Sequence, residues 1–197
     1  MKTNRVVSAL MLVLVAGAAE AEMRRHASTD GNSVFVGKRP GQEKGRWLEV
    51  FDEKALVAHQ TACIGDIDVR VSGKRNEVSR ANDEGILADK LRELIVERLE
   101  AAVLFSRVDA KPPDLLGATA VRIDCQLIVD AKGSGSRSML KIALRNVHDN
   151  ELLAHYHGHG SGSGLASLFA RAGNRKRAKD DLQENTAMFV QLLREFR

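Results

Sequence analysis

The sequence predicts an α/β fold of the α+β kind, a two-layer sandwich in which a mixed sheet of about four to five strands carries helices on one face. Two segments, 63–71 and 121–129, alternate apolar and polar side chains, which is the pattern of a half-buried strand. An amphipathic helix expected at 83–103 supplies the apolar stripe that covers such a sheet. The composition agrees with a folded domain, because 44% of the residues are hydrophobic and 28% are charged.

The N-terminus has the pattern of a secretory signal peptide over residues 1–21. Lys2 and Arg5 precede an uncharged run at 6–19, and Ala19-Glu20-Ala21 fits an A-x-A cleavage site. The alternatives are a buried N-terminal helix and a membrane anchor, but the run is shorter than the roughly 20 residues that span a bilayer. We therefore expect a periplasmic or secreted protein, cleaved near Ala21.

The next segment, residues 22–59, is polar and interrupted by glycine and proline. This composition is typical of a flexible lead-in. Residues 60–197 are then expected to form one α/β domain, a length that suits a single core.

The first two strands of the domain each place a cysteine on the face predicted to be apolar. Cys63 shares that face with Ile67 and Val69, and Cys125 shares it with Ile123 and Leu127. Because an exported chain meets an oxidising compartment, Cys63 and Cys125 are a candidate disulfide. The alternative is two buried free thiols, since cysteine is among the most buried residue types.

The helix between these strands is expected to begin at Asn82, a good N-cap residue, with Asp83 and Glu84 in its first turn. A short strand is expected at 104–108. A parallel pairing of the two long strands would need this helix as its crossover connection.

A hairpin and a final helix complete the pattern. The hairpin strands are expected at 140–144 and 152–159, joined by a turn at His148-Asp149-Asn150. The last helix is expected to follow Asp180-Asp181 and to bury residues such as Leu182, Phe189 and Phe196.

These elements together resemble a group of small bacterial envelope domains. The likeness covers about residues 60–196. It rests on Ile64-Gly65-Asp66-Ile67-Asp68-Val69, the Leu87–Leu99 helix, Val121–Val129, Ser138–Leu144, Leu152-Leu153-Ala154 and the Gly158–Gly164 tract. The shared shape is that of the TolB amino-terminal domain, also found in the curli-secretion lipoprotein and in outer-membrane activators of cell-wall synthases. The chain also looks like an uncharacterised family of small exported proteins, many of them lipoproteins, although it has no cysteine after the apolar run for lipid attachment.

The resemblance implies a non-enzymatic envelope module that binds or assembles with other proteins, and it assigns no functional residue. An envelope protein or a second copy of the chain is the expected partner. A net charge of +4 and a 4% aromatic content argue against nucleic acid as a partner.

The sharpest chemical motif is His155-Tyr156-His157-Gly158-His159. In a strand, the three histidines project from one face, where Asp66, Asp68 and Asp124 also point by alternation. Imidazoles with nearby carboxylates suit Zn²⁺ or Cu²⁺, so a periplasmic metal-binding protein is the alternative function. The same pattern also fits a solvated sheet face, or a surface that responds to pH.

The Gly/Ser tract from Gly158 to Gly164 has two serines, Ser161 and Ser163, that raise the possibility of a hydrolase. No histidine follows His159 to act as a base in the usual order, so we expect a hinge and no catalytic residue.

A basic run at Arg175, Lys176 and Arg177 suits anionic headgroups or cell-wall polymers, so a peripheral membrane contact is considered. A solvated loop before the last helix is the alternative for this run.

Overall fold

The computed structural model describes residues 25–27, 32–37, 45–72, 77–110, 120–130, 137–160 and 175–197. The predicted signal peptide (1–21) and both serines of the Gly/Ser tract lie outside the described residues. Arg175, Lys176 and Arg177 lie in the first turn of the last helix, where only the backbone is described.

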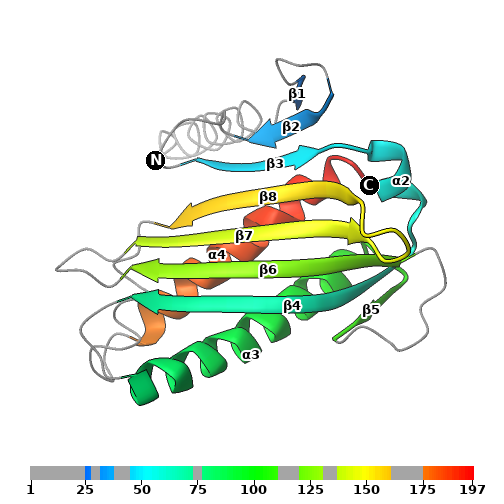
Figure 1. Cartoon of the computed structure of the whole chain (residues 1–197). Coiled ribbons are helices and arrows are strands. Elements are labelled where there is room, and N and C mark those ends of the chain that lie inside the picture. Colours follow the sequence, from blue (N-terminus) through cyan, green and yellow to red (C-terminus); the bar gives the residue numbers. More distant parts are fainter. Residues whose placement is uncertain are drawn as a thin grey trace, which may run out of the picture.

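The described residues form one sheet of eight strands (Figure 1). The strands are β1 (Arg25–Ala27), β2 (Val34–Gly37), β3 (Arg46–Val50), β4 (Thr61–Ser72), β5 (Arg107–Asp109), β6 (Ala120–Asp130), β7 (Arg137–Asn146) and β8 (Leu152–Gly160). Their order across the sheet is β1-β2-β3-β8-β7-β6-β4-β5. Strand β4 runs parallel to β5 and β6, and the other neighbouring pairs are antiparallel, so the sheet is mixed.

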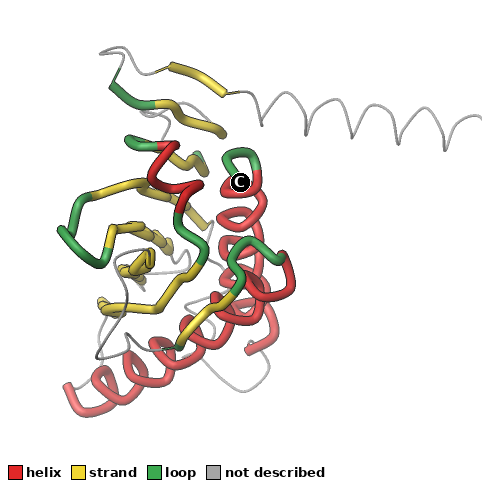
Figure 2. The backbone as a smooth tube through the Cα atoms, turned by 90° about the vertical axis from the view of Figure 1, so that its right-hand side faces the viewer, coloured by secondary structure: helices red, strands yellow, loops and turns green. Residues whose placement is uncertain are grey.

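Two long helices, α3 (Glu77–Ala102) and α4 (Arg175–Arg194), cover the same face of this sheet. Figure 2 shows both helices on one side of the strands. A short helix, α2 (Glu53–Ala58), connects β3 to β4, and the Asp52 carboxylate caps it by accepting a hydrogen bond from the Ala55 amide at 2.8 Å.

The core lies between the helices and the covered face of the sheet. Its sheet side alternates as expected, with Leu140, Ile142 and Leu144 of β7 fully buried. Helix α4 is fixed to β8 by a buried polar contact, in which the Tyr156 hydroxyl donates to the Asn185 carbonyl oxygen at 3.1 Å. A buried hydroxyl needs such a partner, because an unsatisfied one costs about 1–3 kcal/mol.

The predicted fold class is confirmed, but the sheet is larger than the four to five strands expected. The correction concerns residues 22–59, which were expected to be a flexible lead-in. They contain β1, β2, β3 and α2, and they contribute Val36, Leu48 and Val50 to the core. These strands are short, and β3 pairs with β8, which lies more than 100 residues later in the sequence. No local sequence pattern therefore predicts them.

Some boundaries also differ from the sequence predictions. Helix α3 begins at Glu77, one turn and more before Asn82, so Asn82 is not its N-cap. Helix α4 begins at Arg175, ahead of Asp180-Asp181. N-cap preference is a weak local signal, and a helix continues past a good cap residue when the preceding residues also accept helical geometry.

The predicted disulfide is not present: Cys63 and Cys125 are both buried free thiols. Strands β4 and β6 are parallel neighbours, which a bridge between the cysteines would require, but β4 contains a β-bulge between Ile64 and Ile67 that moves the side chains before it to the other face. Cys125 therefore lies in the core, whereas Cys63 pairs across from Arg122 on the opposite face. Two thiols on opposite faces of one sheet cannot bridge without rebuilding the strand.

Candidate functional site

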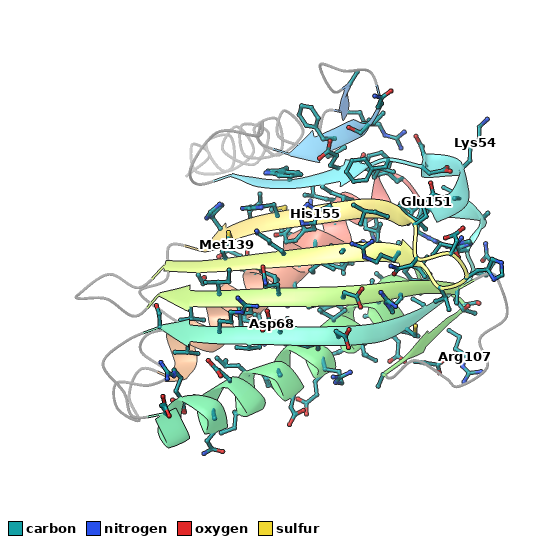
Figure 3. The ribbon with its side chains drawn as sticks, in the orientation of Figure 1. Lys54, Asp68, Arg107, Met139, Glu151 and His155 are labelled. Carbon is teal, nitrogen blue, oxygen red and sulfur yellow. The ribbon has the colours of Figure 1, made fainter. Side chains whose placement is uncertain are left out.

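The face of the sheet turned away from α3 and α4, called here the open face, gathers most of the chemically distinctive side chains. Figure 3 looks onto it, with Met139, His155 and Asp68 labelled on three different strands, α4 behind the sheet, and α3 running below β4 and then behind it. Its central residues are Trp47 and Glu49 on β3, His155, His157 and His159 on β8, Met139, Lys141, Ala143 and Arg145 on β7, and Arg122, Asp124, Gln126 and Ile128 on β6.

The three histidines project from one face of β8, as the sequence predicts, because Ala154, Tyr156 and Gly158 pair with core positions. Their cross-strand neighbours come from both sides. His157 lies between Trp47 on β3 and Lys141 on β7, and His159 pairs with Met139.

Trp47 organises two of these rings. Its indole stacks on the His157 imidazole with ring centroids 5.4 Å apart and planes 5° from parallel. The His155 ring meets the indole edge-on at 5.9 Å and 84°. Trp47, His155, His157 and His159 thus form one aromatic cluster, and its rings are held by mutual contact.

His157 and His159 approach each other most closely at their Nε2 atoms, which are 2.8 Å apart. This is hydrogen-bond distance, so in the neutral pair one ring donates and the other accepts. His155 does not join this contact: its ring centroid is 6.4 Å from that of His157, and the two planes are nearly perpendicular.

The environment of His157 and His155 keeps these two imidazoles neutral. Burial lowers the pKa of His157 to about 4, with further lowering from His159, Lys141 and His155. Burial also lowers the pKa of His155, and Lys141 acts in the same direction while Glu49 opposes it. At neutral pH both rings therefore offer nitrogen lone pairs and carry no charge.

The carboxylates expected beside the histidines lie elsewhere. Asp68 and Asp124 belong to β4 and β6, and β7 separates these strands from β8 by about 10 Å or more at the usual strand spacing. Glu49 is the nearest acid by register, opposite His155, and it accepts a hydrogen bond from the Ser33 hydroxyl at 2.6 Å. Within the described part of the chain, no group of three or more His, Cys, Asp or Glu side chains is arranged around a common metal position.

Asp124 is the centre of a charged network on β6. Arg122 approaches one of its carboxylate oxygens at 3.0 Å, and Arg145 on β7 lies 3.8 Å from the same oxygen. The other carboxylate oxygen accepts from the Asp66 amide at 3.0 Å, which satisfies a backbone donor at the β-bulge. Gly65 leaves room for this arrangement, because a Cβ there would lie 2.7 Å from the Arg122 side chain.

A second polar group joins β4 and β6 further along. Asp68 accepts from Arg70 at 2.9 Å and from Gln126 at 3.1 Å. These bonds lower the pKa of the Asp68 carboxyl, so it stays ionised and paired on the open face.

Sequence analysis missed Trp47, Glu49 and Met139 as parts of this site. Trp47 lies in the segment that was expected to be a flexible lead-in, and β3 is recognised only by its pairing with β8. One local signal for β3 is its short alternating run, in which the single tryptophan of the chain lies two residues from the charged Glu49.

Neither long helix, within the described residues, has the run of apolar sequence that crossing a bilayer requires.

Comparison with known proteins finds no matching family model and no matching curated protein. Among solved structures, the chain is similar to the PelC dodecamer from Paraburkholderia phytofirmans, with a TM-score of 0.40 and 11% identity over 72% of this chain and 95% of that chain. It is also similar to protein XCC0632 from Xanthomonas campestris, with a TM-score of 0.41 and 12% identity over 67% and 82%. A neuraminyllactose-binding hemagglutinin homolog from Helicobacter pylori gives 0.38 and 8% over 68% and 84%. No residue role is transferred from these proteins, and the resemblance to TolB-like domains and to lipoproteins stays a prediction.

Proposed function

We propose that this chain is an exported, non-enzymatic binding module of the bacterial cell envelope, and that it docks a partner protein on its open face. The observation that carries the proposal is the aromatic cluster around Trp47 at the middle of a sheet face that α3 and α4 leave uncovered.

The aromatic cluster has the composition of an interaction surface. Trp, Met and Arg are enriched in protein interfaces, and a tryptophan surrounded by polar side chains is the usual form of an energetic anchor. Trp47 is only partly buried, and its ring is already held by His157 and His155. Docking a partner on it would therefore cost little side-chain conformational entropy.

The charges beside the cluster favour a partner segment that is both apolar and acidic. Lys141 lies directly across from His157, and the described residues place no carboxylate within ion-pair distance of it. Arg145 donates to the Asn150 backbone carbonyl at 3.1 Å, and its ion-pair contact to Asp124 is a long one of 3.8 Å. A carboxylate of the partner beside Lys141, with an apolar side chain on Trp47, would complement both features.

The groups that could serve in acid–base chemistry are engaged in holding the face together. Asp124 pairs with Arg122, and Glu49 accepts from Ser33. This arrangement supports binding over catalysis, and the signal-peptide pattern of residues 1–21 supports a place outside the cytoplasm.

Site-specific photocrosslinking in intact cells tests the proposal. A photoreactive phenylalanine analogue is placed at one of two positions on the open face: at Ala143, which lies between His155 and Asp124, or at Ile128, which pairs with Met139. We expect one discrete adduct with an envelope protein, and loss of that adduct when Trp47→Ala is combined with the crosslinker. Matched controls at Glu97 and Glu100, exposed on α3, should give no such adduct.

Equal crosslinking from α3 and from the open face would contradict the proposal, and so would no adduct at all. An adduct with twice the mass of the chain would identify a second copy as the occupant and would refute the separate partner. Trp47→Phe keeps an aromatic ring and should retain part of the crosslinking, which separates loss of the anchor from loss of the fold.

A further inference from the structure

His157 and His159 are two potential metal ligands whose ring nitrogens lie in direct contact on the open face. Their Nε2 atoms are 2.8 Å apart on a rigid central strand, and the next strand on each side holds β8 in place. The two side chains come from residues i and i+2, so the strand itself sets their spacing.

This spacing selects among metals. With metal–nitrogen bonds of about 2.0 Å, two nitrogens 2.8 Å apart subtend about 90° at the ion. A tetrahedral ion such as Zn²⁺ would need the nitrogens about 3.3 Å apart at the same bond length. An angle near 90° suits two adjacent positions of a square-planar or tetragonal ion, and Cu²⁺ is the divalent ion of this class with the highest intrinsic affinity.

Met139 adds a soft donor at the same place. It pairs directly with His159 across β7 and β8, on the open face, and cross-strand partners have Cβ atoms only about 5 Å apart. A thioether is a weak ligand for Cu²⁺ and a preferred one for Cu⁺.

Trp47 orients the pair. The indole stacked on His157 restricts rotation of that ring, so its Nε2 stays directed at His159. Binding needs both Nε2 lone pairs, and the ring that donates in the metal-free pair reaches that state by carrying its proton on Nδ1 instead.

We propose that His157 and His159 bind a copper ion through their Nε2 atoms, with the Met139 sulfur as a weaker third ligand. The site takes two of the three histidines that the sequence suggested, and His155 is not a ligand. This inference does not depend on the docking partner.

Metal titration of the purified protein tests the copper proposal. The full chain is expressed without an added histidine tag, and the product is purified as the cell processes it. Cu²⁺ should bind with a stoichiometry of one, and Zn²⁺ should bind more weakly. His157→Ala and His159→Ala should each weaken Cu²⁺ binding by more than about tenfold, a loss that even outer-shell partners of a metal produce. His148→Ala, at an exposed turn, is the matched control and should leave the affinity unchanged, whereas His155→Ala should weaken binding less than either ligand variant does.

Two further measurements do not depend on whether the His→Ala variants fold. The electron paramagnetic resonance spectrum of the unmodified protein with Cu²⁺ should show coupling to two nitrogens. Met139→Leu should keep the Cu²⁺ affinity while weakening Cu⁺ binding, measured by competition with a chromogenic Cu⁺ chelator.

Several results would overturn the proposal. These are equal Cu²⁺ affinity of the unmodified protein and both His variants, Zn²⁺ binding as tight as Cu²⁺ binding, or a spectrum without nitrogen coupling. An equal loss in His155→Ala would restore the three-histidine site in its place, and an unchanged Cu⁺ affinity in Met139→Leu would remove the sulfur ligand. Photocrosslinking from Ala143 reports on docking alone, so either proposal can fail without the other.

Discussion

At the scale of single residues, Gly65 shows how a small side chain permits a polar arrangement. It lies within the β-bulge of β4, directly beneath the Asp124 carboxylate and the Arg122 side chain. The carboxylate occupies the space that a methyl group would need, and it satisfies the Asp66 amide there. The sequence motif Ile64-Gly65-Asp66 was recognised as part of an opening strand, but the bulge and its acceptor depend on a side chain 58 positions further along the chain.

Gly65→Ala is therefore expected to lower the free energy of unfolding by about 1–3 kcal/mol, since the added methyl forces the Asp124 and Arg122 side chains to shift. Urea unfolding of the purified protein measures this. Gly85→Ala is the matched control, because the same added methyl on α3 meets no atom within 4 Å and should stabilise the helix by up to about 1 kcal/mol. Similar changes in both variants would show that the bulge does not require glycine.

His59 is a buried histidine that links stability to pH. Its side chain is 6% exposed, and within the described residues neither ring nitrogen has a hydrogen-bond partner. Burial and the nearby Arg197 lower its pKa below the ordinary value, with Asp149 and Asp52 acting weakly in the opposite direction. The folded protein thus binds fewer protons at His59 than the unfolded chain does.

This contribution to stability is complete above about pH 6.5, the ordinary histidine pKa, and it is lost as the pH falls through the lower pKa of the folded state. We expect His59→Leu to lose less stability than the unmodified protein between pH 7.5 and pH 5, measured by urea unfolding at each pH. Parallel loss in both proteins would contradict a neutral buried His59.

At the scale of elements, alternation predicted the long strands well and predicted their faces less well. For β6 and β7, and for β8 from Ala154 onward, the odd and even positions fall as expected, because the strands are regular there. At the start of β8 the register with β7 shifts between Leu152 and Ala154, and Leu153 is buried in the core. For β4 the bulge between Ile64 and Ile67 breaks the two-residue period, so residues after it were assigned to the correct face and Cys63 was not. A bulge inserts one residue without changing composition, so alternation alone cannot detect it.

Thiol titration checks this interpretation of the cysteines. The protein denatured without reductant should release two free thiols per chain, because Cys63 and Cys125 lie on opposite faces of the sheet. In the folded protein both should react slowly, since burial raises the pKa of Cys63 to about 11 and raises that of Cys125 as well. Fewer than one thiol in the denatured sample would mean that the two strands do not have this register.

At the scale of the whole molecule, the sheet draws together segments that are far apart in the sequence. The candidate site combines β3 from the N-terminal part with β7 and β8 from the hairpin, and Trp47 meets His157 over 110 positions of chain. The histidine row could be predicted because its spacing lies within one strand. Trp47 and Met139 could not be assigned to it, since cross-strand neighbours are set by register and not by local sequence.

The N-terminal strands are thus part of the folding unit, and their removal tests how far the domain extends. A chain that begins at Asp52 loses β1, β2 and β3, and with them Val36, Leu48 and Val50 of the core and the 2.7 Å ion pair between Arg46 and Glu184 on α4. It also exposes the backbone edge of β8 and an apolar strip of α4, which favours aggregation. We expect this truncated chain to be insoluble or to unfold well below the temperature at which a chain beginning at Glu22 unfolds, measured by thermal denaturation and limited proteolysis. If the two chains unfolded at the same temperature, residues 22–51 would be the dispensable lead-in that their composition first indicated. Trp47 and the rest of β3 would then add to a domain that folds without them.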